Sequence, residues 1–245
     1  MKYYLKEEFL HDNNAKNAGN KARNDVESIV KSQGFKALIL SVDNWYEMST
    51  AKAQIHKAKA FSHSLNRLNE GDELLIQFPM LHHSFFTTSL VKKARRRGVK
   101  IYFIIHDLDA LRFMNGQAVP LKHRIRMKIQ ESGLLGSSDG IIAHNPIMKS
   151  VLVDKGIAAD KIVSLDIFDY LIPNFQEKTG LTKNQRIIVA GNLAQEKASY
   201  LYSLPAEPAY NLYGVGFDEN RALANETYFG PFLPDELPAA LEGGF

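Results

Sequence analysis

Residues 71–79 read GDELLIQFP, and residues 98–107 read GVKIYFIIHD. They predict strands at 73–78 and 99–106, and runs such as Ile104–Ile105 are apolar through successive residues, as strands are when helices cover both faces of a parallel sheet. The residues between them, 85–97, have the length and charge of a surface helix, and Gly98 follows the helix end, where a left-handed residue is favoured. We therefore interpret residues 71–107 as a strand–helix–strand unit with parallel strands.

The same alternation extends in both directions from this unit. Further strands are predicted at 2–6, 36–41, 140–144 and 161–165, and helices at 21–32, 51–69, 120–135 and 146–155, with Gly34, Gly71 and Gly156 just past helix ends. Repeated strand–helix units with right-handed connections predict an α/β fold with a doubly wound parallel sheet. We assign it to a first domain, residues 1–172.

A second domain is expected over residues 184–245. A polar stretch at 173–180 has the composition of a linker, and a strand at 186–190, a helix at 195–204 and a strand at 210–213 follow it. Two strands and one helix are too few for an independently stable sheet domain. We therefore expect the opening of an incomplete, truncated Rossmann-like domain.

Composition excludes several classes of protein. The 245 residues are 45% hydrophobic and 23% charged, with a net charge of +3, which is typical of a globular chain. No run approaches the roughly 18 apolar residues of a membrane span. Residues 1–12 lack the apolar core of a signal peptide, so we expect a cytoplasmic protein. The absence of cysteine excludes disulfides, thiol nucleophiles and cysteine-ligated metals.

Charge is distributed unevenly. Residues 92–128 hold eleven lysines and arginines against two aspartates, a local charge of +9, whereas residues 201–245 carry −6. The basic segment has three interpretations: solvated helix faces, attraction to anionic lipid at the inner membrane face, or nucleic-acid binding. We expect no nucleic-acid partner, because no aromatic side chains are interleaved as stacking platforms. Homo-oligomer formation stays open.

Two glycine-containing turns follow predicted strands and lead into helices. The first holds Asn17, Gly19, Asn20 and Lys21; the second holds Gly191, Asn192 and Lys197. Glycine permits close approach of a ligand to the backbone, and amides at a helix start favour anions. The first turn is not a P-loop, and its alternative is a surface loop capped by Asn20. For the second turn, the alternative is that Lys197 is only a solvated helix residue.

These motifs, together with residues 139–145, 210–214, 228–230 and 233–238, resemble bacterial GT-B glycosyltransferases of the β-1,6-galactofuranosyltransferase group. They are also similar to the streptococcal glucosyltransferase that extends sugars on a serine-rich adhesin. The resemblance covers nearly the whole chain. It implies transfer of galactofuranose or glucose from a UDP-sugar to a cell-surface glycan, glycoprotein or lipid-linked acceptor, with no metal or other cofactor. In that family the second domain continues beyond position 245, so this fragment would lack part of its donor site and could be inactive.

The resemblance also implies roles for individual residues. Gly191, Asn192 and Lys197 would contact the diphosphate or ribose, with lysine acting as a point charge. Tyr228, in a loop before the 234–238 segment, would contact the nucleotide. Asn17, Gly19 and Asn20, followed by Lys21 at the helix start, would reach toward the donor sugar.

Sugar transfer with inversion needs a base to take the proton of the acceptor hydroxyl. We favour His106 and Asp107, which end the most apolar strand, over Asp43, His82 and His83. The alternative is that a His–Asp pair there only orients a loop, through Arg112.

Two other functions remain open. Asp107 and Asp109 match the Asp-x-Asp pattern with which GT-A glycosyltransferases hold a divalent metal. The six-strand unit followed by a second strand–glycine–helix start favours the two-domain form instead. A non-catalytic Rossmann-like module that binds a nucleotide or a partner protein is the third interpretation. The donor sugar, the acceptor and the stereochemical outcome are not fixed by the sequence.

Overall fold

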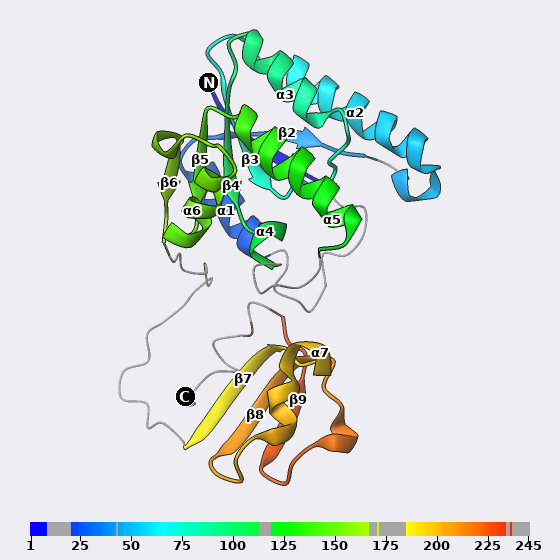
Figure 1. Ribbon diagram of the computed structural model, residues 1–245, viewed down its shortest axis with the longest axis vertical. Coiled ribbons are helices and arrows are strands. Elements are labelled where there is room, and N and C mark those ends of the chain that lie inside the picture. Colours follow the sequence, from blue (N-terminus) through cyan, green and yellow to red (C-terminus); the bar gives the residue numbers. More distant parts are fainter. Residues whose placement is uncertain are drawn as a thin grey trace. The chain divides into compact units, whose positions relative to one another are not determined.

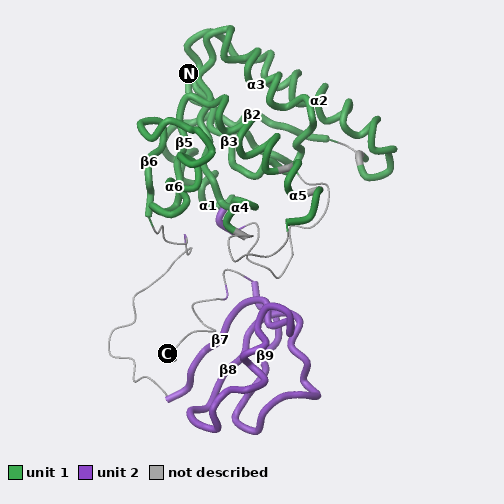
Figure 2. The backbone as a smooth tube through the Cα atoms, in the orientation of Figure 1, with its two compact units in different colours: residues 1–11, 23–169 green, residues 12–22, 170–245 purple. Residues whose placement is uncertain are grey.

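The computed structural model divides the chain into two compact units (Figure 2). Unit 1 comprises residues 1–11 and 23–169, and unit 2 comprises residues 12–22 and 170–245. The structure describes residues 1–8, 21–42, 44–112, 119–166, 171, 185–233 and 236. The expected domain limits, 1–172 and 184–245, stay predictions, and the expected linker at 173–180 lies outside the described residues.

Unit 1 contains a six-stranded, fully parallel sheet in the order β2-β1-β3-β4-β5-β6 (Figure 1). Its strands are β1 (Lys2–Glu7), β2 (Lys36–Leu40), β3 (Glu73–Phe78), β4 (Lys100–Ile105), β5 (Gly140–Ala143) and β6 (Ile162–Ser164). The α-helices around it are α1 (Lys21–Ser32), α2 (Thr50–Asn66), α3 (Thr87–Arg96), α4 (Asp109–Arg112), α5 (Leu121–Arg126) and α6 (Pro146–Asp154). Short 3₁₀ helices lie at η1 (Trp45–Glu47), η3 (Leu135–Ser137) and η4 (Ala159–Lys161), and a π-helix lies at η2 (Met127–Leu134). The doubly wound parallel fold expected from the sequence is therefore confirmed.

The strand order explains which helices cover which face. The chain moves from β1 to β2 in one direction and from β2 through β6 in the other, so right-handed connections place α1 on one face and the later helices on the opposite face. Burial agrees: Val26 of α1 packs with Tyr4, Leu75 and Ile104, which point to its face.

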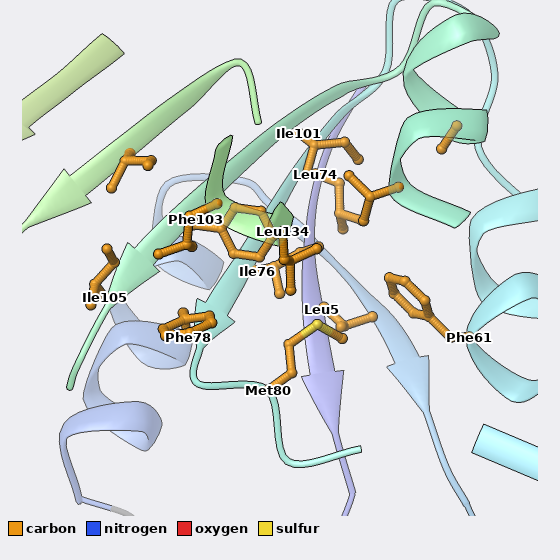
Figure 3. Close-up of a cluster of buried hydrophobic side chains, with 14 of the residues drawn as sticks. Leu5, Phe61, Leu74, Ile76, Phe78, Met80, Ile101, Phe103, Ile105 and Leu134 are labelled. Atoms are coloured by element: carbon orange, nitrogen blue, oxygen red, sulfur yellow. The ribbon is translucent and has the colours of Figure 1, made fainter. Parts of the chain in front are cut away.

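The larger core lies on the face covered by α2, α3, η2 and α6. Its buried side chains come from strands and helices alike; those labelled in Figure 3 are Leu5, Phe61, Leu74, Ile76, Phe78, Met80, Ile101, Phe103, Ile105 and Leu134. Burial of large aliphatic and aromatic side chains contributes roughly 1.5–3 kcal/mol each. This core holds the strand ends, and hence the candidate site, in fixed positions.

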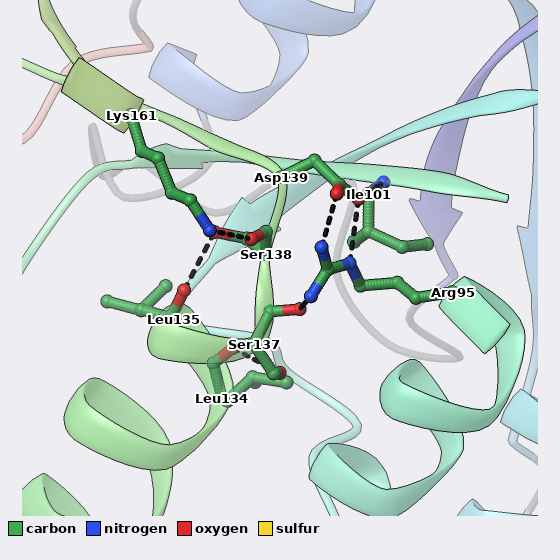
Figure 4. Close-up of polar contacts among 8 residues, drawn as sticks. All are labelled: Arg95, Ile101, Leu134, Leu135, Ser137, Ser138, Asp139 and Lys161. Carbon is green, nitrogen blue, oxygen red and sulfur yellow. Dashed lines mark hydrogen bonds and ion pairs between the residues drawn. The ribbon is translucent and has the colours of Figure 1, made fainter. Parts of the chain in front are cut away.

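Polar groups also join the layers of unit 1 (Figure 4). The Arg95 guanidinium donates from Nε to the Asp139 carboxylate at 2.8 Å and makes a second bond to it through Nη2. It also donates to the Ser137 carbonyl, while the Ile101 backbone N–H donates to Asp139. Burial alone would raise the pKa of Asp139, but these donors outweigh it and hold that pKa below its usual value. Arg95 thus fixes α3 to the start of β5.

Unit 2 contains a three-stranded parallel sheet in the order β7-β8-β9. Its elements are β7 (Arg186–Asn192), α7 (Gln195–Ala198), η5 (Ser199–Ser203), β8 (Ala209–Val215), η6 (Glu219–Arg221) and β9 (Glu226–Gly230). A small core of Leu193, Ala198, Leu201, Tyr210 and Leu212 lies between the sheet and α7–η5. Among the described residues of both units, no helix is long and apolar enough to span a bilayer.

Candidate functional site

The carboxyl edge of the unit 1 sheet has a switch point between β1 and β3. These strands are neighbours, but the connections that leave them run in opposite directions. In open α/β sheets, ligands bind in the crevice at such a point. Glu7 ends β1 and Phe78 ends β3, so the side chains around them form the first candidate site.

Glu7 is a buried carboxylate, and its side chain is only 4% exposed. It accepts hydrogen bonds from the backbone N–H groups of Leu81 and His82 at 3.1 and 2.8 Å, and the Arg23 guanidinium lies 3.8 Å away. Burial raises the pKa of Glu7, and the two N–H donors and Arg23 offset part of that rise. Arg23 also donates to the Pro79 carbonyl. Together they fix α1 and the segment after β3 to the end of β1.

His106 follows β4 and is joined to the same network. Its Nε2 lies 2.6 Å from Gln77 Oε1, and Gln77 Nε2 in turn donates to the Arg23 carbonyl. Burial lowers the pKa of His106 to about 4, with further contributions from Arg23 and His144. The imidazole is therefore neutral at pH 7, and donation from Nε2 to the amide oxygen leaves Nδ1 as the acceptor nitrogen.

His144 lies after β5, with its ring centroid 6.0 Å from that of His106. Burial lowers the pKa of His144 as well. Two neutral imidazoles thus follow adjacent strands, and His106 is bound to Gln77. This group can donate and accept hydrogen bonds with a polar ligand, and it is better suited to binding hydroxyl groups than to taking protons at neutral pH.

The Asp-x-Asp pattern is divided between two environments. Asp107 is partly exposed beside His106, whereas Asp109 is buried at the start of α4 with His123 Nδ1 3.3 Å from its carboxylate. The described residues contain no group of three or more histidines, aspartates or glutamates placed to hold a metal ion. The two-unit parallel fold favours the two-domain interpretation over the GT-A one.

Sequence reasoning missed Glu7, Arg23 and Gln77. A signal existed for Gln77, because it is the polar residue in the apolar strand Glu73–Phe78 and is buried there. Buried polar groups need a partner, so such a residue marks a network. Glu7 and Arg23 carry no comparable pattern. Their pairing depends on which strands become neighbours.

Three predicted residues of the first glycine turn, Asn17, Gly19 and Asn20, lie outside the described residues. Lys21 begins α1, and its ammonium donates to the Leu171 carbonyl. Their predicted contact with a donor sugar stays a prediction.

The second candidate site is the turn after β7 in unit 2. Gly191 pairs in register with Gly214 of β8, and a Cβ at Gly214 would lie 1.7 Å from the Gly191 carbonyl oxygen. The backbones therefore approach more closely here than side chains allow, and Gly214 has a φ of +149°. The Leu193 N–H donates to the Val215 carbonyl at 2.8 Å, which fixes the turn between the two strands.

The predicted helix at 195–204 is replaced by two shorter elements. Only Gln195–Ala198 is α-helical, and Ser199–Ser203 continues as a 3₁₀ turn. A four-residue helix has little macrodipole, so the expected attraction of anions to its start is weaker than the sequence suggested. Lys197 is exposed, and Asn192 Oδ1 accepts a hydrogen bond from the Ala194 N–H.

The expected loop position of Tyr228 is wrong. Tyr228 lies in strand β9, which the sequence analysis did not predict, and its hydroxyl donates to the Gly214 carbonyl at 2.7 Å. Its ring packs against Phe217 with a centroid distance of 5.2 Å. Burial raises the pKa of Tyr228, and Glu219 adds to the rise. The side chain therefore supports the glycine turn directly; contact with a nucleotide stays a prediction.

Comparison with known proteins decides the family. The model of the Glucosyltransferase 3-like N-terminal domain matches residues 2–167, which is most of unit 1. The chain belongs to the Glucosyltransferase 3-like family. It is also 31% identical over 227 residues to the β-1,6-galactofuranosyltransferase WbbI of Escherichia coli (strain K12). That match covers 91% of this chain and 61% of WbbI, so the chain spans less than two thirds of the length of that relative.

Solved structures show the same fold for this member of the Glucosyltransferase 3-like family. The lipopolysaccharide outer core galactosyltransferase WaaB in its apo form has a TM-score of 0.55 at 11% identity, over 98% of this chain and 70% of that one. HepE from Anabaena, in complex with UDP and glucose, has a TM-score of 0.53 at 10% identity, over 98% and 72%. The GT-B-like fold expected from the resemblance is confirmed.

Proposed function

We propose that this member of the Glucosyltransferase 3-like family transfers galactofuranose or glucose from a UDP-sugar to a cell-surface glycan or glycoprotein. The observation that carries the proposal is the 31% identity to a galactofuranosyltransferase, which runs through both units rather than through the family domain alone. The family match over residues 2–167 and the fold shared with glycosyltransferases support it.

In this proposal, unit 2 binds the UDP part of the donor. Gly191 and Asn192 offer a turn whose backbone a diphosphate can approach, and exposed Lys197 provides the cation that balances the leaving phosphate. Tyr228 contributes by holding Gly214 in place. Asn17, Gly19, Asn20 and Lys21 act on the donor sugar. No metal is required, because lysine and backbone donors take that role.

Unit 1 binds the acceptor at the carboxyl edge of its sheet. The acceptor oxygen forms a bond to the anomeric carbon, the bond to the diphosphate breaks, and the hydroxyl proton passes to a base. His106, with a pKa of about 4, is a weak base and instead orients the hydroxyl as a neutral imidazole. Asp107, its neighbour at the end of β4, takes the proton.

Donor binding is tested by calorimetry of UDP with the chain, followed by transfer assays with UDP-galactofuranose and UDP-glucose. Lys197→Ala should weaken UDP binding about tenfold through loss of a charge-assisted contact, and Lys197→Arg should retain it. Glu207→Ala, also exposed in unit 2, is the matched control and should change nothing. Equal UDP affinity of the Lys197→Ala and control variants would contradict the assignment of the donor site.

The acceptor side is tested by the rate of transfer. Asp107→Asn should lower kcat at least about 100-fold with little change in KM, whereas His106→Gln should mainly raise the KM for the acceptor. Asp154→Asn, exposed at the end of α6, is the control. A larger fall in kcat for His106→Gln than for Asp107→Asn would reverse the two roles.

A further inference from the structure

Three helices of unit 1, α2, α3 and α5, lack acidic residues, although the short α4 between β4 and α5 contains Asp109. Together α2, α3 and α5 contain ten lysines and arginines and no aspartate or glutamate. In contrast, α1 contains Asp25 and Glu27, and α6 contains Asp154. Figure 1 shows α2, α3 and α5 on one side of unit 1; α2 packs on α3, and α3 packs on η2, which continues α5. These three helices therefore carry an excess of basic residues, although Lys57 is buried and Arg95 is paired with Asp139.

Large apolar side chains are exposed at the start of the same helices. Phe85 and Phe86 precede α3 and are 62% and 49% exposed, and Leu121 at the start of α5 is 70% exposed. Ile55 in α2, Tyr46 in η1 and Ile125 in α5 are similarly exposed. Because the strands are parallel, the helices after them begin at the carboxyl edge of the sheet. The residues before or at the helix starts therefore lie at one edge, and Ile55 and Ile125 lie about one turn further along their helices.

We call these six residues, with the exposed cations Lys52 and Arg124, the edge patch. The Phe85 N–H donates to Gln54 Oε1 at 2.9 Å, which links the α3 and α2 parts of the patch. Exposed aromatic and aliphatic side chains are rarely grouped on a protein surface unless they meet a partner. Among the described residues of η1 and the three helices, the one carboxylate is Glu47, and the buried Asp109 carboxylate of α4 lies 3.3 Å from His123 of α5.

The basic residues at 92–97 have a different role from Lys52 and Arg124 of the edge patch. Residues 92–97 lie in and after the last turns of α3, at the opposite edge of the sheet. Arg95 is bound to Asp139 and Ser137, and Arg97 donates to the Leu65 carbonyl at 2.7 Å. These two guanidinium groups therefore stabilise unit 1 itself. The sequence run 92–128 does not form one continuous surface.

We propose that the edge patch binds the surface of an anionic phospholipid bilayer. Aromatic and aliphatic side chains enter the boundary between headgroups and acyl chains, while Lys52 and Arg124 bind lipid phosphates. Both components are needed, since the apolar residues provide area and the cations provide preference for negative charge. Single-stranded bases could stack on the aromatic side chains, but a nucleic acid would leave the aliphatic residues Ile55, Leu121 and Ile125 in water. This inference does not depend on the proposed transfer reaction.

The test is flotation of the full 245-residue chain with vesicles. Vesicles of equal parts phosphatidylglycerol and phosphatidylcholine are compared with pure phosphatidylcholine at 0.1 M salt. We expect at least about tenfold stronger binding to the anionic vesicles. Arg124→Glu should weaken it more than about fivefold, and the Phe85→Ser/Phe86→Ser double variant about tenfold. The matched control is Lys31→Glu/Val163→Ser, exposed positions of unit 1 outside the patch, which should bind like the unaltered chain.

Circular dichroism establishes that each variant is folded before vesicle binding is compared. Absence of binding to anionic vesicles, or equal binding to neutral ones, would overturn the proposal. Loss of binding in the control to the same degree as in the patch variants would also overturn it. Binding of an RNA oligomer without vesicle binding would assign the cations to nucleic acid instead.

Discussion

Substitution of Gly214 by alanine tests whether the close approach of β7 and β8 holds unit 2 together. The new Cβ would lie 1.7 Å from the Gly191 carbonyl oxygen, inside any non-bonded contact distance, so the two strands must separate at that pair. The φ of +149° adds about 1–3 kcal/mol of backbone strain. Separation also breaks adjacent ladder hydrogen bonds, and we expect a total loss of about 4 kcal/mol or more.

That loss exceeds what the small core of unit 2 can tolerate. Among the described residues of unit 2, five buried residues form this core, and domains of this size have only a few kcal/mol of stability. Gly214→Ala should therefore unfold unit 2 and leave unit 1 folded. Hydrogen exchange read by mass spectrometry measures this directly, because peptides from β8 should lose protection while peptides from β4 keep theirs. UDP binding should be lost in the same variant.

Two other glycines provide matched controls. Gly191 has a φ of +147° and Gly230 a φ of +79°, but a Cβ at either position would meet nothing within 4 Å. Alanine at either position should lower the free energy of unfolding only by the backbone strain, about 1–3 kcal/mol. If exchange in β8 were no faster in Gly214→Ala than in Gly191→Ala, steric approach of the strands would not be what stabilises unit 2.

Three further predictions concern single contacts. His106 has a folded pKa of about 4, below its unfolded value of about 6.5, so its contribution to stability is complete above pH 6.5 and is lost as the pH falls toward 4. Between pH 7.5 and 5, the free energy of unfolding measured in urea should fall by about 2 kcal/mol more in the unaltered chain than in His106→Gln. Equal falls would refute the argument that burial lowers the pKa of His106. Arg95→Lys should cost about 1 kcal/mol because lysine cannot make the paired bonds to Asp139, with Arg96→Lys as the neutral control in the same urea assay. Tyr228→Phe should destabilise unit 2 by about 1 kcal/mol but change UDP affinity less than threefold, because its hydroxyl is bound to the Gly214 carbonyl; a larger loss of UDP affinity in calorimetry would place that hydroxyl on the nucleotide.

Much of unit 1 was predictable because its signals are local. Strand Glu73–Phe78 is found with the predicted limits, and α1 begins and ends at the predicted residues. Helix α6 shows the reason: Asn145 accepts a hydrogen bond from the Met148 N–H and Pro146 opens the first turn, so neighbouring residues determine where the helix starts. Such signals do not depend on the rest of the fold.

Unit 2 was predicted less well because its elements depend on their neighbours. Residues 226–230 are only a short run that ends in glycine, and they become strand β9 by pairing with β8. The helix predicted at 195–204 changes to a 3₁₀ turn at Ser199, where η5 places Leu201 in the small core. In both cases tertiary contacts override local propensity.

The candidate site shows the same division between local and distant causes. His106 and Asp107 were proposed from the sequence because they end the most apolar strand, whereas the partners that set the environment of His106 come from other elements. Gln77, 29 residues before His106, accepts a hydrogen bond from its Nε2 and so fixes the orientation of the ring, while burial, with a smaller contribution from Arg23, lowers its pKa. The position of a residue at a strand end therefore does not establish its acid–base chemistry. The side chains on neighbouring strands must be known as well.

One topological cause accounts for both functional proposals on unit 1. Parallel strands joined by right-handed connections bring every strand end and every following helix start to the same edge. The buried polar network around Glu7 and the exposed edge patch are therefore at the same edge of one sheet, although one is made by strands and the other by helices. An acceptor attached to a membrane lipid would meet both. This shared edge is a physical reason to favour lipid-linked acceptors over free sugars for this member of the Glucosyltransferase 3-like family.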